Sequence, residues 1–324
     1  MPTSKVCLHK FGKLFTIGPW SEPTRPLKKL LIMLARHLGF QQVIFDCDMT
    51  LVSVEGIDEL ARLKGQSEYV ASLTRQAMNG ELPLEEVYAK RLELLRPTRA
   101  ELNEVGRIYR RTLVPQAVET IATLQQAGVD VFIVSGGLRE AVLDLAGLLK
   151  VPASHVHAVD VQLDELRGAW WDYIRHQYAG NPDETYFAFP ATPLAESNGK
   201  LAVVSQIAAN GKRTMMVGDG MTDLQTREAV RLFVGFGGAE RRAAVAAAAD
   251  VYIEGPSLAS LLPVALSTVA AEKLKDTELQ NVLLAGLHAI EAGQVLFKEV
   301  ARRARILSAY HLALQVQSPH RFGV

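Results

Sequence analysis

The feature that most constrains the fold is a short apolar run, Val43 to Phe45, followed by two carboxylates one residue apart, Asp46 and Asp48. A continuous apolar run of this kind, ending in polar residues, predicts a buried parallel strand over 42–47. Side chains alternate along a strand, so both acids are expected to point the same way and Cys47 the other. Two buried carboxylates need a cation or a shared proton, which favours a ligand site at this strand end.

The composition is that of a globular chain without an overall charge. The 324 residues, 48% of them hydrophobic, are enough for one large domain or two moderate ones. Lys plus Arg and Asp plus Glu both number 35, so neither nucleic acid nor an anionic membrane is favoured as a partner. Two cysteines make no disulfide framework, and the N-terminus lacks a signal-peptide pattern, which predicts a cytoplasmic protein. The longest uncharged apolar stretch, 257–271, contains Pro263 and is too short to span a bilayer.

The alternation of strand and helix patterns predicts an α/β fold. We expect a Rossmann-like parallel sheet with helices on both faces over 41–262, preceded by an N-terminal extension at 1–40. The remaining residues, 263–324, are expected to form a helical C-terminal extension. Within it, 279–316 has the spacing of one long or one broken helix.

Two insertions interrupt the predicted core. Residues at about 53–113 carry helical spacing punctuated by glycine and proline, with no strand pattern, so we expect a helical cap there. Residues 154–189 mix strand-like alternation with aromatic side chains and predict an antiparallel excursion, with a flap at about 158–190.

Four groups of polar side chains fall at predicted strand ends or just before a helix. Since the carboxyl ends of parallel strands share one edge of a sheet, these groups are expected to lie together. Carboxylate oxygens are ligands that Mg²⁺ accepts together with water and phosphate, so the acids among them predict a magnesium site. The groups are Asp46 with Asp48, Ser135, Lys200, and Asp219 with Asp223, and the predicted metal ligands are the four aspartates.

The same groups can perform phosphoryl transfer. The Ser135 hydroxyl and the amides of Gly136 and Gly137 can bind phosphoryl oxygens, because glycine allows a close backbone approach. Lys200 adds a positive charge for the same group. Asp46 is then free to attack phosphorus and form an aspartyl phosphate.

The second acid, Asp48, is placed to protonate the leaving oxygen and later to take a proton from the attacking water. Taken singly, each group has an ordinary explanation as a turn residue, a helix cap or a solvated side chain. Their joint occurrence in this order favours catalysis. Cys47 is expected to be a packing residue.

These motifs together resemble the haloacid dehalogenase superfamily and, within it, the phosphoserine phosphatases. The resemblance runs from about residue 42 to 262 and implies a Mg²⁺-dependent phosphatase with a capped Rossmann-like core. It is carried by D-x-D-x-T at 46–50, the phrases at 55–61, 75–80, 134–137 and 195–200, G-D-G-x-x-D at 218–223, and G-F-G-G at 235–238.

The resemblance also implies roles for individual residues. Arg91 matches the arginine that binds the substrate carboxylate, and Glu55 the acid near the substrate amino group. Met78 and Leu84 match residues that close over the ligand, and Thr222 lies where relatives place a substrate-binding threonine or asparagine.

Three departures from the family pattern predict a reshaped pocket. Met49 stands where serine is usual, next to the catalytic acid, and Leu84 replaces a more usual aromatic residue. The stretch 163–177 is longer than the family pattern predicts and is expected to reshape the flap.

The expected function is therefore hydrolysis of a small phosphomonoester, with L-phosphoserine favoured and a place in serine biosynthesis implied. The alternatives are the same chemistry on a sugar, alcohol or nucleotide phosphate, a phosphotransferase that uses a hydroxyl acceptor, and a non-catalytic metal- or metabolite-binding module. The expected partner is the substrate, with no nucleic acid and no membrane. A homo-oligomer is compatible with the sequence but not indicated by it.

Overall fold

The computed structural model describes most of the chain beyond the N-terminal extension. The predicted N-terminal extension, apart from 37–40, and most of the predicted flap lie outside the described residues. The described residues are 37–78, 84–164, 166, 171, 184–188, 190 and 192–316.

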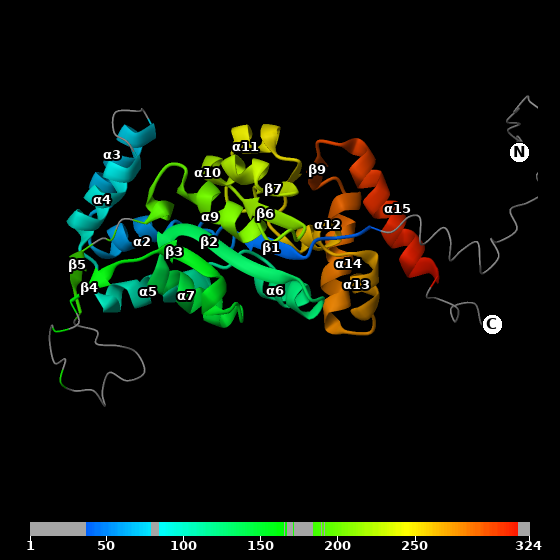
Figure 1. Cartoon of the computed structure of the whole chain (residues 1–324), viewed down its shortest axis with the longest axis horizontal. Coiled ribbons are helices and arrows are strands. Elements are labelled where there is room, and N and C mark those ends of the chain that lie inside the picture. Colours follow the sequence, from blue (N-terminus) through cyan, green and yellow to red (C-terminus); the bar gives the residue numbers. More distant parts are fainter. Residues whose placement is uncertain are drawn as a thin grey trace, which may run out of the picture.

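A seven-stranded sheet forms the centre of the molecule (Figure 1). Its order is β3-β2-β1-β6-β7-β8-β9, and every neighbouring pair is parallel except β8 with β9. The predicted α/β class with a mainly parallel sheet is confirmed. The strands are β1 (Gln42–Phe45), β2 (Asp130–Leu138), β3 (Val156–Val159), β6 (Thr214–Gly218), β7 (Leu232–Phe236), β8 (Val251–Ile253) and β9 (Val295–Phe297).

Helices cover both faces of this sheet, because each strand alternates its side chains between two apolar clusters. Val43 and Phe45 of β1 belong to the larger cluster, and Ile44 to the smaller one. The larger cluster receives side chains from α6 (Ala117–Gln126) and α7 (Arg139–Leu148), the smaller one from α9 (Gly199–Ala208) and α11 (Ala243–Ala248). β1 is thus buried on both faces, as its unbroken apolar run predicts.

In the part of the chain that the structure describes, five helices separate β1 from β2, and the first four of them gather at one end of the molecule (Figure 1). The helical spacing at 56–64, 67–78, 84–95 and 99–112 predicts these four helices, and the observed bounds differ by at most one residue. The last of them begins at Thr98, whose side chain accepts from the Glu101 amide while the Glu101 carboxylate accepts from the Thr98 amide. We propose to treat these helices as the inserted cap: α2 (Gly56–Leu63), α3 (Ser67–Met78), α4 (Leu84–Leu95) and α5 (Arg99–Arg111).

The predicted helical C-terminal extension is observed, and a short strand breaks its last long helical stretch. The strand β9 divides 279–316 into α14 (Glu278–Glu291) and α15 (Val300–Val316) and pairs antiparallel with β8 at the sheet edge. Gly293, with φ of +79°, follows the end of α14 and turns the chain back towards the sheet. The three apolar residues of β9, Val295–Phe297, are too short a run to indicate a strand within the helical spacing on either side. The shorter elements before α14 are η4 (Leu258–Leu261), α12 (Leu262–Ala265) and α13 (Thr268–Lys273).

The predicted antiparallel excursion also began too early. Val156–Val159 is β3, which lies parallel to β2 at the other sheet edge. Only β4 (Gln162–Leu163) and β5 (Tyr186–Ala188) form the antiparallel pair. The misassignment arose because β3 and β4 follow each other after a gap of two residues, without a helix between them.

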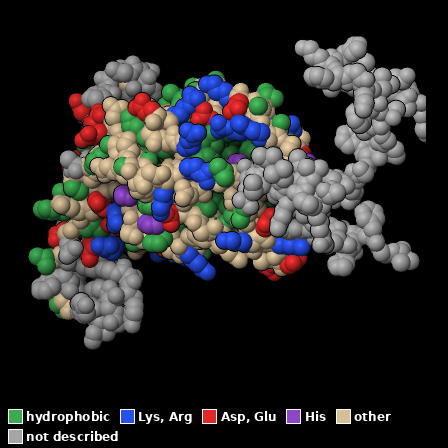
Figure 2. Space-filling view, turned by 45° about the vertical axis from the view of Figure 1, so that its right-hand side comes forward, with side chains coloured by type: hydrophobic (Ala, Val, Ile, Leu, Met, Phe, Trp, Pro, Cys, Tyr) green, Lys and Arg blue, Asp and Glu red, His purple; other side chains and the backbone are tan. Residues whose placement is uncertain are grey.

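Charged side chains of both signs lie on the face of the molecule that Figure 2 shows. On the face in Figure 2, Lys and Arg side chains form several separate groups, with Asp and Glu side chains among them. Among the described residues, no helix combines the length and apolar character that crossing a bilayer would require.

Candidate active site

The site begins where the chain leaves β1. Asp46 follows the last residue of the strand and is 7% exposed. Its Oδ1 accepts a hydrogen bond from the Cys47 amide at 2.8 Å and lies 3.0 Å from Lys200 Nζ. The two contacts fix the direction of the carboxylate, so one of its oxygens is held in place and oriented.

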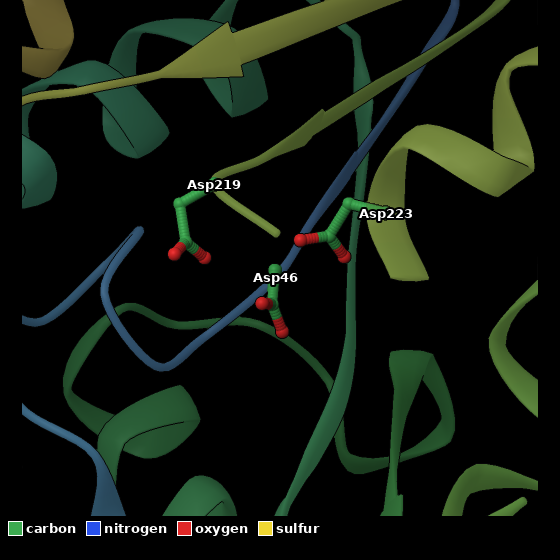
Figure 3. A group of neighbouring side chains, drawn as sticks. All are labelled: Asp46, Asp219 and Asp223. Carbon is green, nitrogen blue, oxygen red and sulfur yellow. The ribbon is translucent and has the colours of Figure 1, made fainter. Parts of the chain in front are cut away.

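Two further aspartates converge on Asp46 (Figure 3). Asp219 follows the end of β6, and Asp223 lies in the short helix α10 (Met221–Gln225). One oxygen from each of the three carboxylates lies within 4.8 Å of the others, and all three residues are buried. The Gly220 amide donates to Asp223 Oδ2 at 2.9 Å and so orients the third carboxylate. The predicted convergence of strand ends β1 and β6 is therefore observed.

Lys200 connects two members of this cluster. It lies in the first turn of α9 and is 8% exposed. Its Nζ donates to Asp223 Oδ1 at 2.6 Å in addition to its ion pair with Asp46. Burial alone would lower the pKa of Lys200, but Asp223 and Asp46 outweigh burial and raise it, so the side chain is a permanent cation.

The carboxylates are crowded beyond what one lysine can neutralise. Burial, followed by the charge of Asp223, raises the pKa of Asp46 well above its usual range. The same two causes raise the pKa of Asp219 to about 7. Negative charge at this site is therefore costly, and a divalent cation would relieve the repulsion.

The donor set fits such a cation. Thr50 Oγ1 donates to Asp219 Oδ1 at 3.4 Å, whereas the buried Asp219 Oδ2 accepts no hydrogen bond. Arg242 Nε lies 3.1 Å from this oxygen, but the geometry is that of an ion pair without a hydrogen bond. Three oxygen ligands with one unsatisfied oxygen suit a hard cation such as Mg²⁺.

Asp48 lines the same cavity but stands apart from the three-carboxylate cluster. Its Oδ1 accepts a hydrogen bond from the Tyr109 hydroxyl. Burial and then the charge of Glu55 raise the pKa of Asp48 to about 8, so the protonated form that a general acid needs is accessible. Asp46 and Asp48 therefore differ in their surroundings, and their catalytic roles and a ligand role for Asp48 remain predictions.

The predicted phosphate loop lies at the carboxyl end of β2. Ser135 is fully buried, and its Oγ accepts a hydrogen bond from the Gly137 amide at 2.9 Å. Ser135, Gly136 and Gly137 all line the cavity that Asp46 faces. Tyr88 of α4 donates its hydroxyl to the Gly136 carbonyl at 2.9 Å, so the cap contacts this loop directly.

The cavity between core and cap has a volume of about 230 Å³. Glu55, Arg91 and Thr222 line it together with the residues above. The guanidinium of Arg91 donates to Thr74 Oγ1, while its buried Nε has no hydrogen-bond partner. Burial lowers the pKa of Arg91 and raises that of Glu55. Met78 and Leu84 are the last residue of α3 and the first of α4, and their side chains lie outside the described part of the structure.

Three residues of the site were missed from the sequence. Tyr88 lies one turn before Arg91 on α4, and this spacing could have indicated it. Arg242 pairs with both Asp219 and Glu55, and Tyr109 contacts Asp48 from the end of the cap, but neither stands in a recognisable motif.

The expected change in the pocket floor at Met49 is not observed, because Met49 is not among the residues that line the cavity. Its φ of +55° places it in the left-handed region, within the turn that follows Asp48. The predicted reshaping of the flap by 163–177 falls mostly outside the described residues.

Comparison with known proteins agrees with this geometry. Residues 40–230 match the haloacid dehalogenase-like hydrolase family. The chain is 36% identical over 213 residues to a Bos taurus phosphoserine phosphatase, covering 65% of this chain and 88% of the relative. It is 35% identical over 198 residues to the Homo sapiens phosphoserine phosphatase, covering 60% and 81%.

A solved structure extends the likeness to three dimensions. The phospho-aspartyl intermediate analogue of a phosphoserine phosphatase is 27% identical, with a TM-score of 0.53, over 69% of this chain and 97% of that one. The motifs, their convergence on one cavity and these similarities agree. The chain belongs to the haloacid dehalogenase-like hydrolases and is a phosphoric monoester hydrolase.

Proposed function

We propose that the protein hydrolyses L-phosphoserine to L-serine and phosphate, with Mg²⁺, through an aspartyl phosphate. The observation that carries the substrate assignment is that Arg91 and Glu55 line the same small cavity as Asp46. A guanidinium suits a substrate carboxylate, and a carboxylate suits an ammonium group. The cavity is smaller than the roughly 300–1,000 Å³ usual for drug-sized ligands, which favours a small amino-acid ester.

The residues divide the reaction between them. Asp46 forms a bond to phosphorus as the ester P–O bond breaks, and Asp48 gives its proton to the departing serine oxygen. Lys200 and the Ser135–Gly137 loop bind the phosphoryl oxygens. Bound at Asp46, Asp219 and Asp223, Mg²⁺ supplies neutralisation of the phosphoryl charge. Asp48 then takes a proton from the water that attacks phosphorus and releases Asp46.

The cap protects the intermediate in this scheme. Besides the hydrogen bond from Tyr88 to Gly136, Glu85 Oε1 of α4 accepts from the Ser197 amide at 3.0 Å and from its hydroxyl at 2.9 Å. Both contacts join the cap to the core, and the one from Tyr88 to Gly136 lies at the cavity. A cap held in this position excludes bulk water, so that a bound water hydrolyses the aspartyl phosphate.

The substrate assignment is tested by phosphate release from a panel of esters. With Mg²⁺ in the buffer, we expect kcat/KM for L-phosphoserine to exceed that for sugar, alcohol and nucleotide phosphates by at least about tenfold, the effect of one good ionic contact. Another ester at the head of the panel would refute the substrate but leave the chemistry intact. Acceptor-dependent turnover without matching phosphate release would instead indicate a phosphotransferase.

Magnesium binding is tested without activity. We expect millimolar Mg²⁺ to raise the midpoint of thermal unfolding, since a cation bound at about 10–100 times its Kd stabilises the fold by roughly 1–3 kcal/mol. At this chain length each kcal/mol is worth about 2 °C. The Asp219→Asn variant, which loses one ligand oxygen, should lose most of the shift. An equal shift in both proteins, or with NaCl at matched ionic strength, would contradict a site at the three aspartates.

The location and the pathway follow only from this proposed activity. A phosphoserine phosphatase makes serine from its phosphate ester, so we infer a role in serine biosynthesis, and a cytoplasmic location remains the prediction of the sequence.

A further inference from the structure

Tyr109 is a fully buried tyrosine whose hydroxyl ends in the active site. It lies in the last helix of the cap, α5, 61 residues after Asp48, and is 0% exposed. Its hydroxyl donates a hydrogen bond to Asp48 Oδ1. The reaction scheme above uses Asp48 but gives Tyr109 no part.

The hydroxyl is enclosed by two glycines. A Cβ on Gly56 would come within 2.1 Å of the Tyr109 oxygen, and a Cβ on Gly137 within 3.1 Å of it. The hypothetical Gly137 Cβ would also lie 3.1 Å from Asp48 Oδ2, so the phosphate loop passes close to both side chains. The absence of side chains at these two positions leaves the space in which Tyr109 reaches Asp48.

The hydrogen bond has one direction. The Tyr109 hydroxyl is the donor and Asp48 Oδ1 the acceptor. Asp48 itself lies in a turn rather than in a strand, and the next residue, Met49, has left-handed backbone geometry. The Asp48 carboxyl also has a hydrogen bond from the Gly56 backbone, so the Tyr109 hydroxyl is one of two donors that fix its orientation.

We propose that Tyr109 is a positioning residue that orients Asp48 for proton transfer to and from the oxygens at phosphorus. The inference rests on the proposed function, because it needs Asp48 to be the general acid and base. When Asp48 gives its proton to the departing oxygen, as Asp46 bonds to phosphorus and the ester bond breaks, it becomes a carboxylate. A hydrogen bond to an ionised acceptor is stronger, so Tyr109 stabilises Asp48 most after the proton has left.

The test is the Tyr109→Phe variant, with Tyr310→Phe as its matched control. Tyr310 is also 0% exposed and donates its hydroxyl at 2.9 Å, but to the Leu266 carbonyl, outside the active-site cavity. For Tyr109→Phe we expect kcat on L-phosphoserine to fall by about 10–100-fold, part of the roughly 10²–10⁴-fold that acid–base catalysis contributes, with KM changed by less than about threefold. Tyr310→Phe should change neither constant.

The leaving group separates positioning from general damage. p-Nitrophenolate is a good leaving group that needs no proton. The pre-steady-state burst of p-nitrophenolate released from p-nitrophenyl phosphate should therefore be as fast in Tyr109→Phe as in the wild type. Release of serine from L-phosphoserine should be slowed. A burst slowed as much as serine release, or a change in KM alone, would overturn the proposal.

A double variant gives a second, independent readout. If Tyr109 acts through Asp48, adding Tyr109→Phe to Asp48→Asn should lower kcat no further. A further loss of about tenfold or more would show that Tyr109 acts by another route and would overturn the proposal. Failure of the proposed function looks different, because the wild-type chain would then release no phosphate from L-phosphoserine. If the wild-type chain prefers another ester, the wild type and the Tyr109 and Asp48 variants are compared on that ester.

Discussion

Replacing Asp46 by asparagine will lower the rate of phosphate release by at least about 10³-fold, the scale seen when a nucleophile is removed. In the proposed mechanism the carboxylate oxygen bonds to phosphorus, and a neutral amide is a poor nucleophile that cannot take its place. The variant keeps the shape of the side chain and an oxygen to accept from the Cys47 amide. The loss will therefore appear in kcat, for every ester that the wild type hydrolyses.

The fold of this variant is expected to remain intact. Burial raises the pKa of Asp46, and Asp223 and Asp219 add repulsion, so the charged side chain is held at a cost in stability. Asparagine removes that repulsion while weakening one ion pair with Lys200, whose hydrogen bond to Asp223 remains. The thermal midpoint should therefore be equal to or above that of the wild type in metal-free buffer.

Asp130→Asn is the matched control. Asp130 is also paired with a lysine, Lys212. It is the first residue of β2, so it lies at the amino ends of the strands, away from the carboxyl ends that carry the site. Its replacement should leave kcat within about twofold, as is usual for an exposed ion pair. Retention of wild-type turnover by Asp46→Asn would contradict an aspartyl phosphate and reopen the non-catalytic alternative or another nucleophile.

The core of this site was predictable because its parts belong to strand ends. Asp46, Ser135 and Asp219 each follow an unbroken apolar run, and parallel strands bring such positions to one edge regardless of their separation in sequence. The order of strands did not need to be known for this argument. The same logic predicts an inserted cap, because a helical block between two strands that pair with each other must lie outside the sheet.

The parts that escaped prediction depend on contacts without a local signal. β9 joins the sheet through pairing with β8, and its three residues carry no period of their own. Tyr109 reaches Asp48 only because two glycines far apart in sequence leave space around its hydroxyl. Arg242 approaches Asp219 from a loop after β7. Such residues are determined by packing between elements, which a single sequence does not display.

We propose that the cap arginine, Arg91, selects the substrate. Replacing Arg91 by alanine is expected to lower kcat/KM for L-phosphoserine by about 10²–10³-fold, because the loss leaves a buried substrate carboxylate unpaired. Arg91 lines the cavity, and its Nε is buried without a hydrogen-bond partner. The guanidinium therefore has an unused donor that a ligand in the cavity could pair with. Burial lowers the pKa of Arg91, and the nearby carboxylates of Asp58 and Glu55 oppose this shift.

The neighbouring lysine provides the control. Lys90 lies on the same helix, is exposed, and pairs with Glu86 one turn earlier, so Lys90→Ala removes a positive charge from α4 without touching the cavity. It should change kcat/KM by less than about twofold. Arg91→Lys, which keeps the charge but loses the planar fork, should fall between the wild type and Arg91→Ala.

An ester without a carboxylate completes the argument. Hydrolysis of p-nitrophenyl phosphate makes no use of a carboxylate-binding arginine, so Arg91→Ala should leave its kcat/KM within about threefold. A selective loss on L-phosphoserine supports Arg91 as the residue that recognises the amino-acid part of the substrate. Equal losses on both esters would mean that Arg91 supports the cap or the phosphoryl site. No loss on either would favour a substrate without a carboxylate, and the remaining charges at the cavity, Glu55 and Arg242, would then be the residues to vary next.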